Sequence, residues 1–311
     1  MNRKEFLRAS ALLGIGMSGG VAHAQSLFSA QKSKRLVILH TNDMHSHIEP
    51  FPEDDPKYPG QGGMARRAAL IKQIRAEGHP VLLVDAGDVF QGTPYFNLFK
   101  GALEFKLMSE MGYDAATLGN HDFDNGVEGL AKMLPLAKFP FVNSNYALEN
   151  TPIHKDIKPH LILKKGGLKV GIYGLGVDLN GLVSSALTGE VRYLDPVVAA
   201  NRTASFLRNE AGCDLVLCLS HLGFEYKTRK ISDLSIAASL NHTDIILGGH
   251  THTFLHKPVL TKDFKGQPLV IGQTGWAGIH LGRIDLFFSP ENQLLDTKTT
   301  VYEISKKTIA G

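Results

Sequence analysis

The sequence predicts an α/β domain in which helices cover both faces of the sheet. Short runs of valine, isoleucine and leucine, typical of buried strands, alternate along the chain with stretches whose apolar residues recur at helical spacing. Such alternation is typical of α/β proteins. With 311 residues, of which 43% are hydrophobic, the chain has enough apolar material for a large core and too much for a disordered protein.

Residues 1–24 have the pattern of an export signal. A charged start precedes the weakly apolar stretch 9–21, and Ala22-His23-Ala24 is typical of a cleavage site. The stretch is too short to span a bilayer comfortably. It resembles a twin-arginine signal in which Lys4 replaces the second arginine. We therefore expect a periplasmic or otherwise exported protein without a membrane segment in its mature form; an ordinary secretory signal or an uncleaved anchor is the alternative.

After a polar linker, 25–34, residues 35–311 are expected to form a single domain, because neither an internal repeat nor a break in composition divides them. The expected strands are 36–39, 81–84, 115–118, 170–174, 215–219, 245–247 and 269–271, and the expected helices are 64–75, 196–208 and 231–240. A Pro-rich loop, 48–60, is interpreted either as a surface excursion or as an active-site lid.

The cysteine positions argue against a redox pair or a cysteine metal site, and the net charge gives no reason to expect nucleic-acid binding. Cys213 and Cys218 are five residues apart on an expected strand, so their side chains point to opposite faces and lie beyond disulfide reach. We interpret them as buried thiols. The net charge is only +3 and no basic run stands out, so no nucleic-acid partner is expected.

Polar side chains follow five of the expected strands at the points where these strands end. They are Asp43, His45, Asp88, Asn120, His121, Asp124, His221, His250 and His252. In α/β sheets, sites form at the carboxyl ends of parallel strands. If the five strands share one parallel sheet, all these side chains converge on one edge. Glycines directly before several of them, such as Gly87, Gly119 and Gly249, permit sharp turns and close backbone approach.

The residue types at these strand ends predict a pair of metal ions. Seven of these residues are counted as ligands: two carboxylates (Asp43 and Asp88), the amide oxygen of Asn120 and four imidazoles (His45, His221, His250 and His252). Such a set without thiolate suits Zn, Mn, Fe or Co. Seven ligands are too many for one tetrahedral ion, but they suit two ions about 3.5–4 Å apart that share a carboxylate and hold a bridging hydroxide. Two divalent ions, two aspartates and this hydroxide leave a net charge of about +1, which attracts a phosphoryl group. His121, with Asp124 three residues on, suits a proton donor to the leaving group.

The motifs that contain these residues resemble those of the calcineurin-like metallophosphoesterases. They are Asp43-x-His45, 87–92, 119–124, His221 and 249–252, and the strings 40–45 and 62–65 resemble the 5′-nucleotidase branch. The resemblance covers residues 35 to about 305. It implies a central β-sandwich flanked by helices, a four-layer α/β/β/α arrangement.

The resemblance also implies roles for individual residues. One metal would take Asp43, His45, Asp88 and His252, and the other would take Asp88, Asn120, His221 and His250. Asp88 would bridge the two ions, His121 and Asp124 would form the catalytic dyad, and Asn120 and His121 would contact substrate.

Several neighbouring residues are expected to have other roles. His47 is a candidate for a contact with a ligand or the substrate, whereas Asp85 and Asp122 are interpreted as turn or supporting groups. Arg66 and Arg67 are expected on a solvent-exposed helix, with a phosphate contact as the alternative. The aromatic residues near the motifs are expected to pack in the core: Phe90, Phe123, Phe224, Tyr226 and Trp276.

The leading functional hypothesis is an exported dinuclear-metal phosphomonoesterase acting on nucleotides or similar small phosphoesters by attack of the bridging hydroxide. One alternative is a phosphodiesterase or pyrophosphohydrolase acting on 2′,3′-cyclic nucleotides or UDP-sugars. Another is a metal-loaded binding protein without turnover. Nucleotidases of this branch usually carry a C-terminal domain that recognises the base, whereas this sequence stops at Gly311. A further hypothesis within the leading one is that a separate polypeptide partner supplies such a domain.

Overall fold

The computed structural model describes residues 33–309. The export signal predicted for residues 1–24 and nearly all of the predicted linker lie outside the described residues. Lys34, the last residue of that linker, is already the first residue of a strand. Between residues 33 and 309, no helix has the length and hydropathy that crossing a membrane requires.

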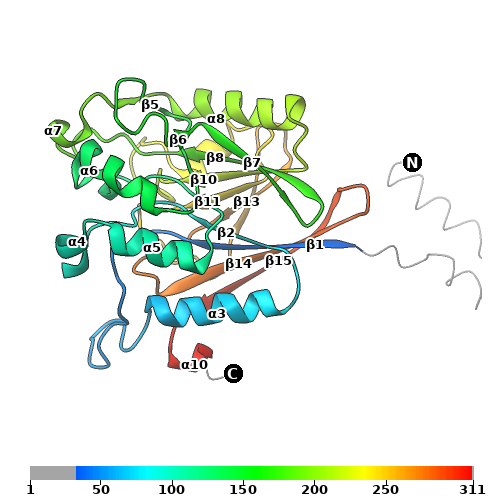
Figure 1. The fold of residues 1–311 in the computed structure, drawn as a ribbon. Helices are drawn as coiled ribbons and strands as arrows, with labels where there is room; N and C mark the ends of the chain where they lie inside the picture. Colours follow the sequence, from blue (N-terminus) through cyan, green and yellow to red (C-terminus); the bar gives the residue numbers. More distant parts are fainter. Residues whose placement is uncertain (1–32, 310–311) are drawn as a thin grey trace, which may run out of the picture. The chain divides into compact units, whose positions relative to one another are not determined.

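Two mixed β-sheets form the centre of the described unit (Figure 1). The seven-stranded sheet has the spatial order β15 (Leu294–Glu303), β14 (His280–Phe288), β1 (Lys34–Thr41), β2 (Val81–Asp85), β3 (Ala115–Ala116), β4 (Phe141–Val142) and β6 (Ile157–Lys158). The six-stranded sheet has the order β12 (Val259–Lys262), β13 (Pro268–Gly272), β11 (Ile245–Gly248), β10 (Leu215–Ser220), β8 (Leu168–Leu175) and β7 (His160–Lys165). A small third sheet pairs β5 (Tyr146–Ala147) with β9 (Arg192–Tyr193). In the seven-stranded sheet, β1, β2, β3, β4 and β6 are parallel, and the antiparallel strands β14 and β15 lie at one side only. In the six-stranded sheet, the four inner strands are parallel and both edge strands, β12 and β7, are antiparallel to their neighbours.

Helices cover the outer faces of the two sheets (Figure 1). The helical elements are α3 (Met64–Ala76), α4 (Pro94–Phe99), α5 (Ala102–Met111), η1 (His121–Phe123), α6 (Gly126–Met133), η2 (Leu134–Leu136), α7 (Ser185–Thr188), α8 (Pro196–Ser205), η3 (Phe206–Glu210), α9 (Asp233–Ala237) and α10 (Lys306–Ile309). Helices α3 and α5 lie beside the seven-stranded sheet, and α8 lies beside the six-stranded sheet.

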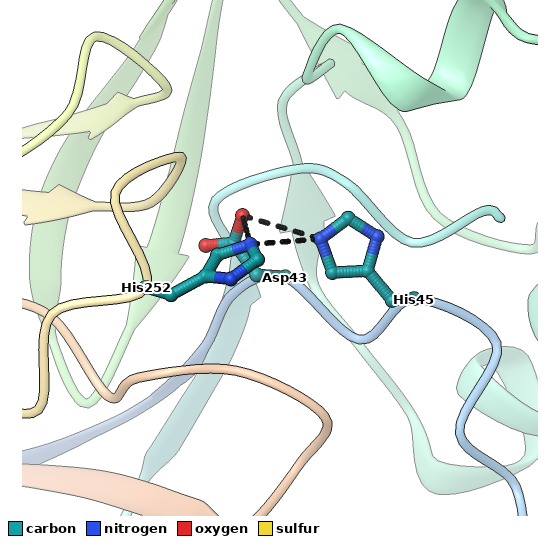
Figure 2. Close-up of side chains that lie close together, drawn as sticks. All are labelled: Asp43, His45 and His252. Carbon is teal, nitrogen blue, oxygen red and sulfur yellow. Dashed lines mark hydrogen bonds and ion pairs between the residues drawn. The ribbon is translucent and has the colours of Figure 1, made fainter. Parts of the chain in front are cut away.

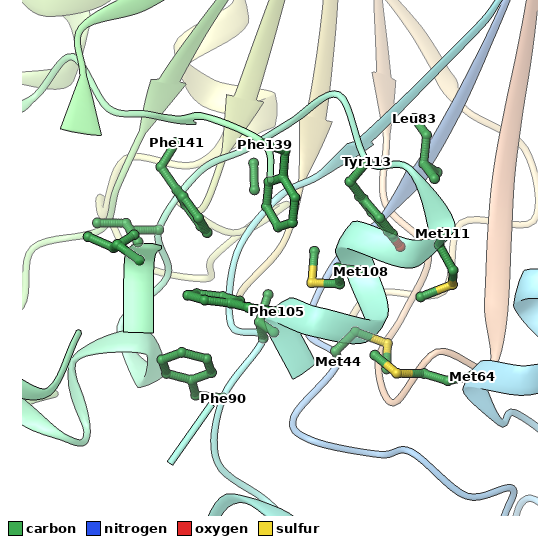
Figure 3. Packing of buried hydrophobic residues seen from close by; sticks show 14 of the residues in the cluster. Met44, Met64, Leu83, Phe90, Phe105, Met108, Met111, Tyr113, Phe139 and Phe141 are labelled. Atoms are coloured by element: carbon green, nitrogen blue, oxygen red, sulfur yellow. The ribbon is translucent and has the colours of Figure 1, made fainter. Parts of the chain in front are cut away.

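Three apolar layers hold these elements together, and strand β1 shows how the sequence produces them. Successive side chains of a strand point to opposite faces. Leu36 and Ile38 therefore pack between the two sheets, whereas Val37 and Leu39 pack against the helices. The helix-side layer is rich in methionine and phenylalanine from α3, α5 and the connecting loops (Figure 3). A third layer joins the six-stranded sheet to α8 and α9. Four structural layers enclose three apolar ones, which confirms the α/β/β/α sandwich implied by the family resemblance.

The five strands do not share one parallel sheet, which was one way for their ends to converge. Strands β1, β2 and β3 belong to the seven-stranded sheet, and β10 and β11 belong to the six-stranded sheet. Each strand is buried on both faces in either arrangement, by two helix layers or by one helix layer and a second sheet, so its apolar pattern is the same. The loops that follow these strands nevertheless meet: His221 Nδ1 lies 2.7 Å from the carbonyl oxygen of Ala86, which follows β2.

The predicted strands and helices are present in the structure, but several begin or end at other residues than predicted. Strand 115–118 shrinks to Ala115–Ala116, and helix 231–240 shrinks to Asp233–Ala237. Helix 196–208 ends at Ser205 and continues as the π-helical turn η3. Cys213 and Cys218 are free and buried, as predicted.

Gly174 of β8 is a closely packed point between the sheets and gives a stability prediction. A Cβ there would overlap the carbonyl oxygen of Val142 and Oγ1 of Thr117. Because a backbone atom cannot move aside cheaply, Gly174→Ala is expected to lower the free energy of unfolding by about 3 kcal/mol. Gly212→Ala is the control, since φ is +66° there and nothing lies within 4 Å of its Cβ; it should cost about 1 kcal/mol. Urea denaturation compares the two, and an equal or reversed order would contradict this packing.

Candidate metal centre

All seven predicted metal ligands lie together where the carboxyl ends of strands from both sheets meet. Asp43 and His45 follow β1, Asp88 follows β2 and Asn120 follows β3. His221 follows β10, and His250 and His252 follow β11. Within the described chain, the side chains that could hold a metal ion fall into two groups of three, Asp43 with His45 and His252, and Asp88 with His221 and His250.

The first group contains Asp43, His45 and His252 (Figure 2). The Nε2 atoms of the two imidazoles lie 2.9 Å apart. Oδ1 of Asp43 is 3.4 Å from Nε2 of His252 and 3.8 Å from Nε2 of His45. Three donor atoms from two loops therefore point at one another across a small space.

The second group contains Asp88, His221 and His250, and Asn120 joins it. Oδ2 of Asp88 lies 3.0 Å from Nε2 of His221. Oδ1 of Asn120 lies 2.7 Å from Nδ1 of His250. The same Oδ2 of Asp88 is 3.8 Å from Nε2 of His45 in the first group. Asp88 therefore lies within reach of both groups, as a bridging carboxylate must.

The donor atoms fit divalent cations better than they fit one another. Nε2 of His45 and Nε2 of His252 can form one N–H···N hydrogen bond with each other, whereas a cation between them would take the lone pairs of both. Nε2 of His221 is fully buried and faces Asp88 Oδ2 at 3.0 Å, but within residues 33–309 it makes no well-aligned hydrogen bond, which is costly for a buried polar atom. Nitrogen and oxygen donors without thiolate suit Zn, Mn, Fe or Co. The two groups thus fit a dinuclear divalent metal site.

The backbone at the ligands is held in the left-handed region. The φ angles are 50° at Asp43, 49° at His45, 56° at Asp88, 73° at His250 and 51° at His252. Each such residue other than glycine costs about 1 kcal/mol or more, and this conformation persists only where the surroundings impose it. Hydrogen bonds between the loops do so: His45 N donates to the carbonyl of Asp88 at 3.0 Å, and His250 N donates to Oδ2 of Asp43 at 2.9 Å. The ligand loops are therefore positioned by one another.

Neighbouring polar groups orient the ligands. Nδ1 of His221 donates to the carbonyl of Ala86, which leaves Nε2 facing Asp88. Both oxygens of Asp122 accept backbone hydrogen bonds, from the nitrogens of Asp88, Val89 and Gly119 among others. Asp85 similarly accepts from Thr41 Oγ1 and Gly87 N. The interpretation of Asp85 and Asp122 as supporting groups is confirmed. Burial raises the pKa of each of these two carboxyls to about 7.

His121 and Asp124 form a directly bonded pair beside the second group. Nδ1 of His121 lies 2.7 Å from Oδ2 of Asp124. This hydrogen bond raises the pKa of the imidazole against the opposing effect of burial. The backbone nitrogen of His121 donates to Oδ1 of Asp88 at 2.7 Å. The imidazole is 35% exposed, so it is both oriented and open to a substrate.

The expectation that Arg67 lies on an exposed helix face is wrong. Its side chain is 1% exposed, and its guanidinium contacts Sδ of Met44. Position 67 is three residues after Met64 and four before Ile71, both on the buried face of α3, so helical spacing already places it there. Arg66 is half-buried and donates to the carbonyl of Gly60.

Trp276 was expected in the core, but it lies on the first ligand group. Its ring stacks on His252 with centroids 5.5 Å apart and an interplanar angle of 6°. Phe51 and Tyr58 of the Pro-rich loop pack on its other sides at 6.0 and 6.1 Å. His47 lies in the same cluster, 5.2 Å from Trp276. The loop therefore lies beside the candidate metal centre.

The other aromatic residues near the motifs divide into two kinds. Phe90 and Phe123 are fully buried, as predicted. Phe224 is partly buried and packs against the third apolar layer. Tyr226 instead lies near the second ligand group, with its ring 6.5 Å from that of His250.

Residues 36–254 match the family model described as calcineurin-like phosphoesterase. A snake venom 5′-nucleotidase from Gloydius brevicauda is 34% identical over 297 residues, which cover 89% of this chain and 49% of the relative. The 5′-nucleotidase of Homo sapiens is 32% identical, over 87% of this chain and 50% of the relative. The chain thus spans about half the length of these curated relatives.

Solved structures show the same likeness. A 5′-nucleotidase precursor from Thermus thermophilus superposes with a TM-score of 0.80 at 31% identity, covering 88% of this chain and 55% of that one. A calcineurin-like phosphoesterase from Bacillus subtilis gives a TM-score of 0.70 at 25% identity, covering 89% of this chain and 95% of that one. The family match spans most of the chain and includes every residue of both ligand groups, so the chain belongs to the calcineurin-like phosphoesterase family.

Proposed function

We propose that this chain is a metal-dependent phosphomonoesterase that hydrolyses nucleotides or similar small phosphoesters. The observation that carries the proposal is the pair of ligand groups around Asp88, with the bonded pair His121–Asp124 beside them. Relatives that share this region at 32–34% identity are named 5′-nucleotidases, which supports nucleotides as the substrate class.

We assign Asp43, His45, Asp88 and His252 to one metal ion, and Asp88, Asn120, His221 and His250 to the other. The two groups of three support this division. Two divalent ions bound there supply the Lewis acidity that activates water and neutralises charge on a phosphoryl group. Zn, Mn, Fe and Co all agree with these donors.

His121 acts as the general acid in this proposal. Hydrolysis forms a bond from phosphorus to a water oxygen and breaks the bond to the leaving oxygen, which then needs a proton. His121 donates that proton, and Asp124 keeps the imidazole protonated and correctly turned. Asn120 and His121 also contact the phosphoryl group in this proposal, since they are consecutive residues whose turn is bonded to Asp88 through the backbone nitrogen of His121.

We also propose that the protein is exported, on the basis of the N-terminal pattern of residues 1–24. The name of the Gloydius relative, a venom enzyme, agrees with export. The separate specificity polypeptide stays a prediction.

Chelation is expected to stop phosphate release from AMP, and added Mn²⁺, Zn²⁺ or Co²⁺ is expected to restore it. The reason is that the chelator removes the cations from the buried donor atoms, and the proposed reaction needs these cations to activate water. A colorimetric phosphate assay measures this, and thermal unfolding checks that the chelated protein remains folded. Release that continues at the same rate after chelation would contradict the metal centre. A panel of AMP, a 2′,3′-cyclic nucleotide and a UDP-sugar tests the substrate class, and preference for either of the last two would replace the monoesterase by the diesterase or pyrophosphohydrolase.

A further inference from the structure

A polar pocket lies on the same edge of the sandwich as the metal centre, outside the ligand groups. It holds about 590 Å³ of space open to solvent. Its polar lining residues are Tyr146, Asp178, Asn180, Ser185, Thr188 and Tyr193. We call it the β4–β8 pocket, because the loops that follow strands β4 and β8 form two of its walls.

The topology places this pocket directly beside the metal centre. Strand β4, followed by Tyr146, neighbours β3, which leads to Asn120. Strand β8, followed by Asp178, neighbours β10, which leads to His221. Adjacent strands lie about 4.8 Å apart. The pocket is thus the next position along the edge in both sheets, at the carboxyl ends where α/β proteins bind ligands.

The walls of the pocket contact the element that carries His121. The ring of Tyr146 lies 5.9 Å from the ring of Phe123, which shares the turn η1 with His121. Helix α7, which supplies Ser185 and Thr188, packs on the start of α6, where a Cβ added at Gly126 would lie 3.5 Å from Cδ2 of Leu187. Helix α6 begins two residues after Asp124. The pocket is therefore on the side of the site where a proton from His121 would reach a leaving group.

The chemistry of the lining selects an uncharged, hydroxylated group. Oδ1 of Asp178 accepts from Asn180 N at 3.1 Å and from Asn180 Nδ2 at 2.9 Å. Its Oδ2 has no hydrogen bond among residues 33–309 and can accept from a ligand hydroxyl. Ser185 and Thr188 add further hydroxyls, and the half-buried ring of Tyr193 adds an aromatic surface. No lysine or arginine of the described chain lines the pocket, so the charged group that a second phosphate would meet there is the carboxylate of Asp178.

We propose that the β4–β8 pocket binds the hydroxylated leaving group of the substrate, such as the pentose of a nucleoside monophosphate, while the phosphoryl group binds at the metal centre. This inference rests on the proposed function and assigns a part of the substrate to a place in the fold. The Asp178 carboxylate accepts hydrogen bonds from the sugar hydroxyls, and Asn180 holds that carboxylate in place.

Asp178→Ala tests the pocket through the choice between two substrates. The leaving group of AMP carries sugar hydroxyls. The leaving group of p-nitrophenyl phosphate, p-nitrophenol, has no such hydroxyls. The ratio of kcat/KM for AMP to that for p-nitrophenyl phosphate is expected to fall about tenfold or more, because hydrogen bonds to a charged group contribute about 1.5–3 kcal/mol. Glu190→Gln, which removes an exposed carboxylate of the same segment outside the lining, should leave the ratio unchanged. An unchanged ratio in Asp178→Ala would overturn the proposal.

Direct binding separates the failure of this inference from the failure of the proposed function. Adenosine has the hydroxyls but no phosphoryl group, so calorimetric titration into the metal-loaded protein reports on the pocket without turnover. Wild type should bind adenosine about tenfold more tightly than Asp178→Ala does, and it should bind adenine, which lacks the sugar, weakly. If wild type does not hydrolyse AMP, the proposed function fails while this difference still tests the pocket. Equal adenosine affinity of the two proteins would overturn the pocket even if AMP is hydrolysed.

Discussion

Asp88→Ala is expected to remove both metal ions and with them all measurable phosphate release, because the Asp88 carboxylate lies within reach of both ligand groups. Its Oδ2 lies 3.0 Å from His221 Nε2 and 3.8 Å from His45 Nε2. Even residues that only support a metal ligand change metal affinity by about 10–100-fold. The loss of a shared ligand should therefore exceed about 100-fold in metal affinity.

Elemental analysis of the purified variant measures this effect directly. Glu110→Ala is the control, since it removes an exposed carboxylate outside both groups, whose partner is the exposed Lys138. Thermal unfolding of chelated samples separates a loss of metal from a loss of fold. Retention of two ions by Asp88→Ala would show that Asp88 does not bridge. The shared role would then move to Asp43, whose Oδ1 lies 3.9 Å from His221 Nε2 of the other group.

The ligand set could be predicted because its information is local. The sequence alone shows where acids, asparagine and histidine follow the end of an expected strand. Knowledge of which strands are neighbours is not needed for this. The seven side chains come together whether the strands belong to one sheet or two. For this reason the convergence of the seven side chains does not depend on a single shared sheet, and only the family resemblance indicated the sandwich.

What could not be predicted depends on contacts between distant segments. Trp276 lies after the expected strand at 269–271, in a segment without a repeating pattern of apolar residues. Only the fold places its ring on His252. Arg67 is a different case, because its helical position indicated burial while its charge indicated exposure. Position was the better guide, since the helix packs over the Met44 loop. The β4–β8 pocket joins the ends of two strands in different sheets, and no sequence window contains both.

His121→Ala is expected to keep both metal ions but to lower turnover of AMP by about 10²–10⁴-fold, the usual contribution of a general acid. The alanine variant retains the backbone nitrogen that donates to Asp88 Oδ1, so the bridging ligand stays in place. The loss should be much smaller for p-nitrophenyl phosphate, whose good leaving group needs little protonation. Equal losses on the two substrates, or a loss of metal, would assign His121 a structural role instead.

Asp124→Asn tests the same role through pH. A general acid must be protonated, so kcat/KM falls as the pH rises through the pKa of His121. The hydrogen bond that His121 Nδ1 donates to Asp124 raises that pKa. Removing the carboxylate lowers it, and the fall should therefore begin at a lower pH in Asp124→Asn than in wild type. Stopped assays of AMP hydrolysis across the neutral and alkaline range measure the shift. If the fall of kcat/KM in Asp124→Asn begins at the same pH as in wild type, or at a higher pH, the proton lost in this range does not belong to His121. The two variants together thus distinguish a group that gives up a proton from one that only holds a loop.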